Sequence, residues 1–469
     1  MNSKYKDLLK NTAIFALGSL GSKVILFFLV PLYTNFLSTA EYGIADLTST
    51  FSQLLMPITS LMISSAVIRF GMMKGENPED VALVSFVVIG LSTVATISTI
   101  PILSLYDPIR EWKLYLVAQI VFGNIVEVEK TYLKVKNRNK LFSIISIVQT
   151  TILAGVNILL LTVLRLGIRG YLMANVAASA VGSILAFASG GLYRDLRHGR
   201  FDAGLLLRML KYSVPLIFSN ISWWFVHSSD KIMIEAMIGA SSLGLYVAAS
   251  KIPSLINVMI GIFNQAWGIS SIKEIESTNE RSFYSSVFNL FSTFLFVSCN
   301  IFIALIKPFM DIYVGNDFKG AWTYTPFLLA AAVFYSVSAL IGTLYSALRK
   351  TKNDMWTTVL CAAVNVVVNY CGIKAFGVWG AIAGTLCAYL TIATVRLFDI
   401  KRLMDFTISP AFWVNTLVLL LHAMAVTTQW HSFVVSFLSL LTVVIINRSE
   451  LFVIVGAASN FLFGKSSDG

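Results

Sequence analysis

Apolar stretches long enough to cross a bilayer recur along the whole chain. A transmembrane helix needs about 20 mainly apolar residues, and only helices or closed barrels satisfy every backbone polar group in lipid. The chain is therefore expected to be an all-α polytopic membrane protein with about 14 transmembrane helices, or 12 as the alternative. The candidate ranges are 10–37, 44–70, 81–105, 113–133, 141–164, 170–193, 212–239, 244–270, 283–306, 321–348, 355–376, 378–398, 410–428 and 432–447.

Composition excludes several other classes of protein. Of the 469 residues, 57% are hydrophobic and 13% are charged, and the mean hydropathy is +0.77. The charged share is about half the ~25% typical of soluble domains, which excludes an ordinary soluble enzyme, a disordered chain and a disulfide scaffold. The four cysteines (Cys299, Cys361, Cys371 and Cys387) lie in apolar segments without CxxC spacing. No metal site and no cofactor is therefore expected.

The basic residues predict an orientation. The net charge is +11, from 35 Lys and Arg against 24 Asp and Glu. With a cytoplasmic N-terminus, 25 of the basic residues fall on the cytoplasmic side and seven outside, as in membrane proteins generally. This bias explains the positive charge without nucleic-acid binding. Lys4, Lys6 and Lys10 precede an apolar stretch too long for a cleaved signal. The last apolar piece, Leu451 to Phe463, is short and could lie at the interface.

A weak internal repeat predicts two lobes. Gly43, in the segment from Leu37 to Leu47, aligns with Gly244, and a long helix with an internal proline follows each of them. Because six spans separate the two glycines, the halves have the same orientation. A parallel repeat implies a pseudo-two-fold axis along the membrane normal, with a central cleft. We expect an N-lobe of six helices over 1–200 and a C-lobe of six over 201–400. Helices 13 and 14 and a tail follow over 401–469.

Polar side chains form stripes on three expected helices. Residues on one helical face recur every three or four positions. On the second span the stripe is Asp46, Thr50, Gln53, Pro57, Ser60 and Ser64. On the seventh it is Asn220, Trp224, His227, Lys231 and Glu235, with Asp230 beside it. On the eighth, Lys251 and Ser254 precede Asn257, Gly261, Asn264 and Gly268.

These stripes would line a water-filled cleft, although Ser and Gly stripes can also serve helix packing alone. The candidate polar lining is Asp46, Thr50, Gln53, Asn220, His227, Asn257 and Asn264. A second set could couple transport to an ion or form an ion pair near the outer interface. Its members are Asp230, Lys231 and Glu235.

Two lysines stand deep within apolar spans. Neither Lys23 nor Lys251 has an acid three or four residues away, and a charge inside a span usually faces a cavity or a partner. Together with Arg69, which could instead be a topology anchor, they would form a cationic site suited to phosphate or pyrophosphate. Trp223, Trp224 and Trp267 could stack on sugars or anchor the chain at the interface. We expect Glu127 and Glu129 to pair with Lys130 and Lys134.

Motifs for catalysis or nucleotide binding are missing from the sequence. Gly464-Lys465-Ser466 resembles the end of a phosphate-binding loop, but position 459 is Ser where Gly is needed. No HExxH, GxSxG or paired-carboxylate pattern occurs, and the expected external loops leave no room for a catalytic domain. The chain is therefore not expected to be an enzyme, and an ion gradient or the substrate gradient would drive transport.

Several local motifs resemble a known family. They are Asn11-Thr12 to Pro31-Leu32-Tyr33, the turn Ser38-Thr39-Ala40-Glu41-Tyr42-Gly43, the basic helix exit Tyr132-Leu133-Lys134-Val135-Lys136-Asn137-Arg138, and the turn at Gly244. Over about residues 1–400 the chain resembles the polysaccharide and O-antigen flippases of the multidrug/oligosaccharidyl-lipid/polysaccharide (MOP) superfamily.

The resemblance implies a substrate and a mechanism. The chain would move undecaprenyl-pyrophosphate-linked oligosaccharide, as O-antigen, capsule or exopolysaccharide units, to the outer leaflet of a bacterial inner membrane by alternating access. It also implies that Lys23, Arg69 and Lys251 correspond to cavity cations of related lipid flippases, with Lys replacing the usual Arg at the first and last positions. The implied partners are the lipid-linked oligosaccharide, membrane lipids, and a polysaccharide polymerase with its chain-length machinery, and no nucleic acid.

Two other functions are weighed against the flippase. A multidrug or cation antiporter of the same superfamily would need an acidic cavity, and the intramembrane acids are few (Asp46, Asp230 and Glu235). A membrane-embedded polysaccharide enzyme would typically carry a large external loop, which the sequence lacks.

Overall fold

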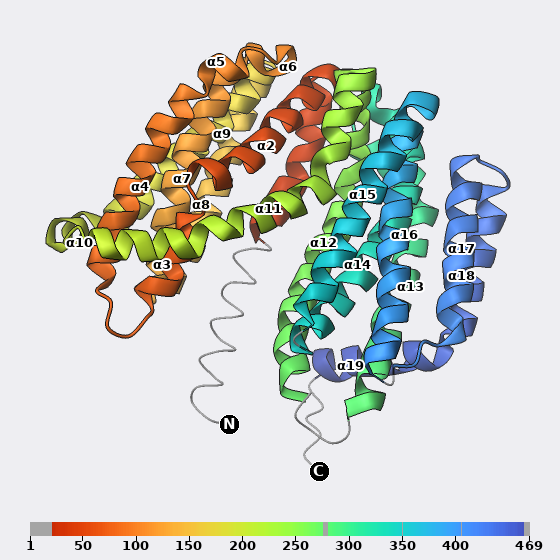
Figure 1. Cartoon of the computed structure of the whole chain (residues 1–469). Helices are drawn as coiled ribbons and strands as arrows, with labels where there is room; N and C mark the ends of the chain where they lie inside the picture. The colour runs from red at the N-terminus through yellow and green to blue at the C-terminus, as the bar shows by residue number, and fades with distance from the viewer. Residues whose placement is uncertain (1–20, 275–279, 349, 405, 464–469) are drawn as a thin grey trace. The chain divides into compact units, whose positions relative to one another are not determined.

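The computed structural model describes residues 21–274, 280–348, 350–404 and 406–463, and these form helices and short connections without a β-strand (Figure 1). Each of the fourteen expected ranges coincides with a helical segment there. The first of them is helical over Gly21–Phe36, while residues 10–20 and the lysines before them lie outside the described part. The predicted all-α polytopic fold is confirmed.

Within that described part, eight helices are long and apolar enough to cross a membrane, or ten if two bent pairs each count as one span. The bent pairs are α2 (Thr39–Thr59) with α3 (Ile63–Gly71), and α18 (Ser432–Ile446) with the start of α19 (Arg448–Phe463). Three further long helices, α7 (Lys113–Val135), α11 (Ala203–Ile238) and α12 (Ala240–Glu274), coincide with expected spans. That all fourteen cross the membrane stays a prediction.

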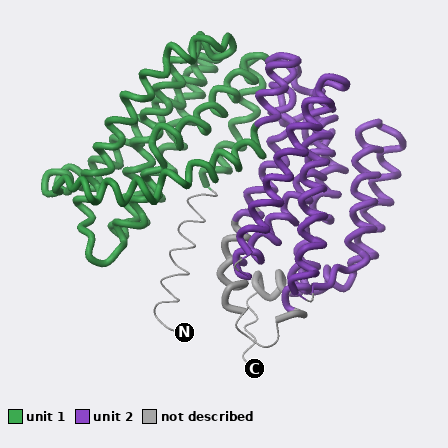
Figure 2. The backbone as a smooth tube through the Cα atoms, in the orientation of Figure 1, with its two compact units in different colours: residues 1–228 green, residues 229–469 purple. Residues whose placement is uncertain are grey.

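The chain packs as two compact units, residues 1–228 and 229–469 (Figure 2). Their boundary falls inside α11, whereas the expected lobe boundary precedes that helix at 200/201. The expected division of the chain, with its pseudo-two-fold axis, stays a prediction.

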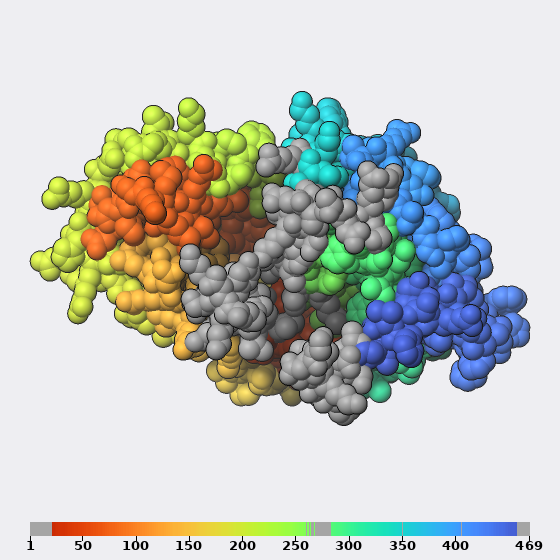
Figure 3. Space-filling model, turned by 90° about the horizontal axis from the view of Figure 1, so that it is seen from below, coloured from red at the N-terminus to blue at the C-terminus, as the bar shows by residue number. Residues whose placement is uncertain are grey.

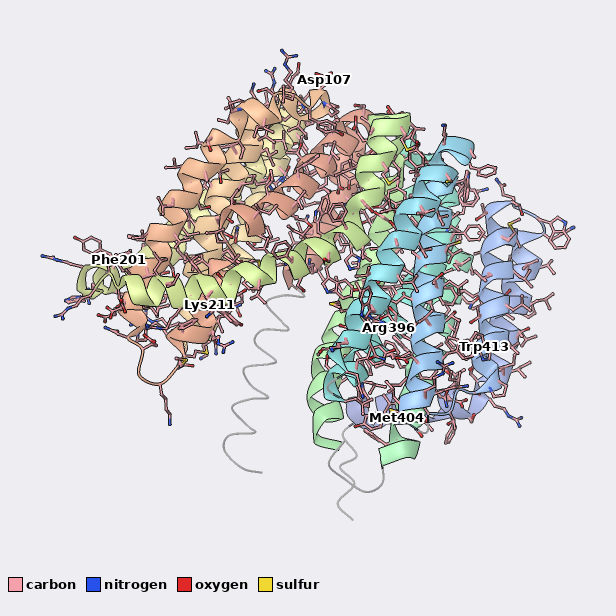
Figure 4. The ribbon with its side chains drawn as sticks, in the orientation of Figure 1. Asp107, Phe201, Lys211, Arg396, Met404 and Trp413 are labelled. Atoms are coloured by element: carbon pink, nitrogen blue, oxygen red, sulfur yellow. The ribbon has the colours of Figure 1, made fainter. Side chains whose placement is uncertain are left out.

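Residues 1–228 contain a continuous apolar core among α3, α4 (Pro78–Ser98), α7 and the start of α11. Ile63, Val84, Tyr132 and Met209 are buried in it. Asp107 marks one end of this unit's helices and Phe201 the opposite end (Figure 4). The remaining elements of the unit are α5 (Ile100–Leu103), α6 (Asp107–Arg110), α8 (Asn139–Ile158), η1 (Leu159–Val163), α9 (Ile168–Gly190) and α10 (Leu192–His198).

The second predicted span begins and breaks for identifiable reasons. At its start, the Glu41 backbone N–H donates to Ser38 Oγ at 3.2 Å, and the Glu41 carboxylate accepts from the Ser38 backbone, which forms a capping box. After Pro57 the helix ends, and Leu61 and Met62 adopt positive φ angles of 53° and 52°. The helix α3 then continues at an angle of 53° to α2.

Residues 229–469 hold a bundle around α14 (Thr325–Ala347), most of whose side chains are buried. Here α12 runs without a break across Pro253, unlike α2 at Pro57. The helix α19 bends 79° away from α18, and its first residues, up to Gly456, lie at the surface on the face shown in Figure 3. The other elements of the unit are α13 (Glu280–Tyr313), η2 (Asn316–Thr323), α15 (Thr351–Phe376), α16 (Val378–Leu403) and α17 (Pro410–Thr427).

A buried arginine on α16 joins three helices of this unit (Figure 4). Arg396 is 1% exposed, and it donates to Asp354 Oδ1 at 2.5 Å, to Thr357 Oγ1 at 3.0 Å and to the Ser338 carbonyl at 2.8 Å. A buried charge is tolerated only when it is paired and fully hydrogen-bonded. Arg396 therefore fixes α14, α15 and α16 to one another.

The packing of α15 against α16 yields a stability prediction. A Cβ atom at Gly380 would lie 1.9 Å from the carbonyl carbon of Gly372, so Gly380→Ala must push the helices apart. Overpacking typically costs about 1–3 kcal/mol, and we expect a lower Tm for the purified protein. Gly90→Ala on α4 is the matched control, because nothing lies within 4 Å of a Cβ there. Equal melting of the two variants would contradict the close packing.

Candidate functional site: a polar cavity and a buried carboxylate cluster

A polar cavity of about 560 Å³ lies within residues 1–228, among α2, α3, α7 and α11. Its lining combines hydrogen-bonding and aromatic side chains. The lining residues are Gln53, Met56, Pro57, Ser60, Met62, Ser64, Ser65, Asn124, Glu127, Asn220, Trp223, Trp224, His227 and Ser228.

Two of the stripes seen in the sequence meet at this cavity. From the α2 stripe come Gln53, Pro57, Ser60 and Ser64, and from the α11 stripe come Asn220, Trp224 and His227. Met62 at the bend and Ser65 of α3 also line the cavity, which the helical spacing did not indicate. Segments about 160 residues apart in sequence thus supply most of the polar lining.

Trp224 joins the two walls of the cavity. Its indole Nε1 donates to the Thr50 carbonyl at 3.1 Å, and both residues are buried. Beside it, the rings of Trp223 and His227 stack with centroids 5.7 Å apart and an interplanar angle of 13°. Both of these rings line the cavity, so α11 presents flat aromatic surfaces beside amide and hydroxyl groups.

The helix α7 adds two polar residues that belonged to none of the polar stripes found in the sequence. Asn124 is buried, and its amide donates to Thr59 Oγ1 at 3.0 Å and to Ser92 Oγ at 3.3 Å. Glu127 is exposed on the cavity wall and is the one carboxylate in the lining. Of the lysines expected to pair with it, Lys130 interacts electrostatically with Glu127. Both lysines also lie over the Phe142 ring, with Nζ of Lys130 at 5.3 Å and of Lys134 at 4.2 Å from its centroid.

The predicted cations do not line this cavity. Lys23 is exposed on the helix Gly21–Phe36. Arg69 is also exposed, with its guanidinium carbon 4.3 Å from the centroid of the Tyr212 ring. Lys251 is half-buried on α12 in the other unit, where it makes a contact of its own. A joint anion site of these side chains stays a prediction.

The other predicted lining residues lie elsewhere. Asp46 is half-buried, and its carbonyl accepts from Thr50 Oγ1 at 2.8 Å. Asn257 is exposed on α12. The side chain of Asn264 lies outside the described residues.

A second polar cluster, within residues 229–469, surrounds Asp230. Asp230 is buried and accepts hydrogen bonds from the Tyr246 hydroxyl and, at 2.9 Å, from the Lys231 backbone N–H. Lys231 and Glu235, which the sequence grouped with it, are half-buried on the same helix, and both make contacts.

Two asparagines of α15 extend this cluster. Asn365 Oδ1 accepts from Ser229 Oγ at 3.1 Å and from Asn369 Nδ2 at 2.9 Å. On α16, a Cβ at Gly384 would lie 1.9 Å from Asn369 Oδ1, so only glycine fits there. Asn369 Oδ1 and Thr385 Oγ1 are buried without a hydrogen-bond partner among the described residues. The α11–α15–α16 region thus gathers a carboxylate and several neutral oxygens.

The chain matches a family model and several known membrane proteins. The model described as "Polysaccharide biosynthesis protein" matches residues 8–268, more than half of the chain. The uncharacterized membrane protein MJ1375 of Methanocaldococcus jannaschii is 24% identical over 302 residues, which cover 61% of this chain and 70% of that protein. An uncharacterized membrane protein of Haemophilus influenzae is 21% identical over 367 residues, which cover 76% and 88%.

Solved structures share the fold. The lipid II flippase MurJ in an inward closed conformation aligns with a TM-score of 0.68 and 15% identity, over 94% of this chain and 100% of that one. An inward-facing MATE multidrug resistance transporter of the MOP superfamily aligns with a TM-score of 0.65 and 15% identity, over 82% and 94%. The chain therefore belongs to the polysaccharide biosynthesis protein family and has the fold of the MOP superfamily.

Proposed function

We propose that this protein is a flippase that moves a lipid-linked oligosaccharide from the cytoplasmic to the outer leaflet of a bacterial cytoplasmic membrane by alternating access. The observation that carries the proposal is the polar, aromatic cavity of residues 1–228, together with membership in the polysaccharide biosynthesis protein family. The protein would act as a transporter and not as an enzyme.

The cavity suits a glycan chemically. Its volume of about 560 Å³ falls in the range of roughly 300–1,000 Å³ that is typical of small-molecule sites. Amide and hydroxyl groups of Gln53, Asn220 and Ser64 can exchange hydrogen bonds with sugar hydroxyls, and the Trp223–His227 pair offers a flat apolar surface. A hydroxyl-rich ligand with apolar ring faces matches both kinds of group.

The headgroup would be held by other side chains. We assign pyrophosphate binding to Lys23 and Lys251, with Arg69 as a third cation. These residues lie outside the cavity lining, so the glycan and the pyrophosphate would have separate contacts. A lysine ammonium supplies a point charge without the two-pronged geometry of arginine, which suits a headgroup that must be released on the other side.

Coupling to an ion gradient is assigned to the Asp230 cluster. Ionisable groups buried in membrane helices are costly and mark ion pathways. The residue before Asp230, Ser229, donates to Asn365 Oδ1, which also accepts from Asn369, so amide groups of α15 approach this part of α11. Oxygen ligands of this kind suit a small hard cation. Lys231 and Glu235 on the same helix would adjust the local charge.

The setting follows from the substrate class. We place the N-terminus in the cytoplasm of a bacterium. In this orientation the loops predicted to be cytoplasmic carry most of the basic side chains. The partners would be the lipid-linked oligosaccharide, membrane lipids, and a polysaccharide polymerase with its chain-length machinery.

One feature favours a second function. Glu127 places a carboxylate in an aromatic cavity, and such a site also suits an organic cation. The multidrug antiporter hypothesis predicts that overexpression raises drug resistance and that Glu127→Gln abolishes the increase. Resistance that depends on Glu127, with no effect on surface polysaccharide, would replace the flippase proposal.

The aromatic wall of the cavity gives a first functional prediction. Trp223→Ala removes a stacking surface, and because aromatic contacts contribute about 0.5–1.5 kcal/mol, we expect transport of lipid-linked oligosaccharide in proteoliposomes to fall about fivefold. The matched control is Trp413→Ala on α17, an exposed tryptophan away from the cavity. Equal rates for the two variants would contradict the role of the cavity in glycan binding.

The cation assignment gives a second prediction. Lys23→Ala and Lys251→Ala should each lower surface polysaccharide at equal protein level, because the pyrophosphate loses a counter-charge, whereas Lys→Arg at either position should retain most output. The control is Lys374→Ala, because Lys374 is exposed in the last turn of α15 and is not part of the proposed headgroup site. Normal surface polysaccharide in both alanine variants would refute this headgroup site.

The carboxylate cluster gives a third prediction. Asp230→Asn keeps an acceptor for Tyr246 but removes the charge, so gradient-driven transport should be lost while exchange down a substrate gradient continues. Proteoliposomes with and without imposed proton and sodium gradients measure this difference. Asp311→Asn, at an exposed position of α13, should leave gradient dependence intact. An Asp230→Asn variant that still responds to both gradients would exclude the assignment.

A further inference from the structure

A second, apolar cavity lies within residues 229–469. Its volume is about 650 Å³, and it lies between α12 and α13 with a residue of α19 at its edge. Among its described lining residues, Ser298 alone has a polar side-chain atom. Phe263, Phe291 and Phe294 supply aromatic surface. We call this cavity the apolar groove, and nothing in the polar cavity or the Asp230 cluster contributes to it.

The α12 wall of the apolar groove is one continuous helical face. Ile256, Ile260 and Phe263 line the groove, and Trp267 follows with the same spacing of four, three and four residues. The Phe263 ring stacks on Phe291 at 4.6 Å with an angle of 20°, and on Trp267 at 6.5 Å with an angle of 9°. The aromatic wall therefore continues from the groove to Trp267.

Trp267 carries a buried donor without a partner. The residue is 6% exposed, and its indole Nε1 has no hydrogen-bond acceptor among the described residues. A buried donor that is left unsatisfied costs about 1–3 kcal/mol, so a ligand oxygen at this position would be favoured. In the predicted topology α12 runs toward the cytoplasm, which places Trp267 nearer the cytoplasmic leaflet than Ile256.

We propose that the apolar groove binds the hydrocarbon chain of a polyprenyl phosphate carrier, with a headgroup oxygen accepting from the Trp267 indole. This inference rests on the proposed function and adds an entry site for the lipid portion of the substrate. Lys251 and Trp267 are separated by 16 residues of α12, or about 24 Å of helix, so the headgroup would contact Trp267 on entry and the Lys251 site only afterwards. The chemistry required is one long apolar chain with an acceptor oxygen at its head end. The groove supplies the apolar lining, and Trp267, which stacks on the lining residue Phe263, supplies an indole donor that has no acceptor among the described residues.

A polyprenyl chain fits this groove better than a phospholipid does. A polyprenyl lipid has one hydrocarbon chain, whereas a phospholipid has two chains attached side by side to one headgroup, which need a wider groove. The planar double bonds and methyl branches of a polyprenyl chain also offer flat faces to the stacked rings of Phe263 and Phe291. The substrate would enter from the cytoplasmic leaflet, where the Trp267 end of the groove is expected.

Photo-crosslinking of the full-length protein in phospholipid nanodiscs tests the proposal. The probe is a polyprenyl phosphate with a diazirine in its chain. We expect labelled peptides from α12 and α13, and labelling that excess unlabelled polyprenyl phosphate competes away but phosphatidylglycerol does not. Trp267→Phe should weaken competition by polyprenyl phosphate several-fold and leave competition by the polyprenyl alcohol nearly unchanged.

Groove-filling variants provide the decisive comparison. Ser298→Trp should lower crosslinking at least tenfold, and Leu417→Trp, on an exposed face of α17, should not. If Ser298→Trp lowers the Tm, Phe294→Trp at the exposed edge of the groove serves instead. Labelling that phosphatidylglycerol competes equally, or that persists in the groove-filling variant, overturns the proposal. Because the readout is binding, specific crosslinking in a protein that fails to transport oligosaccharide would refute the flippase function and support the groove.

Discussion

The structure depends on the requirement that a backbone inside a bilayer satisfies its own hydrogen bonds. A helix can break at membrane depth only where protein or a water-filled cavity covers the exposed groups. The break between α2 and α3 meets this condition: the Met62 N–H donates to the Pro57 carbonyl at 3.1 Å, Ser60 Oγ donates to the Met56 carbonyl at 2.7 Å, and Met62 itself lines the polar cavity. The break and the cavity therefore support each other, since the cavity tolerates the irregular backbone that shapes its wall.

The buried charged groups of residues 229–469 fall into two kinds. Arg396 donates hydrogen bonds to acceptors on α14 and α15 and forms an ion pair with Asp354, so its burial is compensated by groups within the protein. Asp230 has a phenol and a backbone N–H as partners, while Asn369 Oδ1 on α15 and Thr385 Oγ1 on α16 have no hydrogen-bond partner among the described residues. A group whose surroundings are complete holds helices together. A carboxylate in a region that also holds oxygens without hydrogen-bond partners is suited to bind a cation reversibly.

Sequence patterns predicted the elements well because span length and helical spacing are regular signals. The α2 and α11 stripes converge on one cavity at Gln53, Pro57, Asn220 and His227, as a shared wet face requires. Single residues escaped prediction because one polar side chain on an apolar helix makes no pattern: Asn124 and Arg396 acquire their roles only through partners 32 to 65 and 38 to 58 positions away. Spacing along one helix pointed to the interaction of Glu127 with Lys130 but could not show that Lys130 and Lys134 also lie over Phe142 of α8.

The two helices that the predicted repeat aligns, α2 and α12, differ in shape at their prolines. In α2 the chain breaks after Pro57 and polar groups surround the bend, whereas α12 passes Pro253 unbroken and carries the straight apolar row from Ile256 to Trp267. An extended hydrocarbon chain can pack along the apolar row of α12. A compact glycan can bind in the polar cavity beside the bend of α2. Under the proposed function, divergence of two similar helices would thus give one protein contacts for the two chemically incompatible parts of an amphipathic substrate.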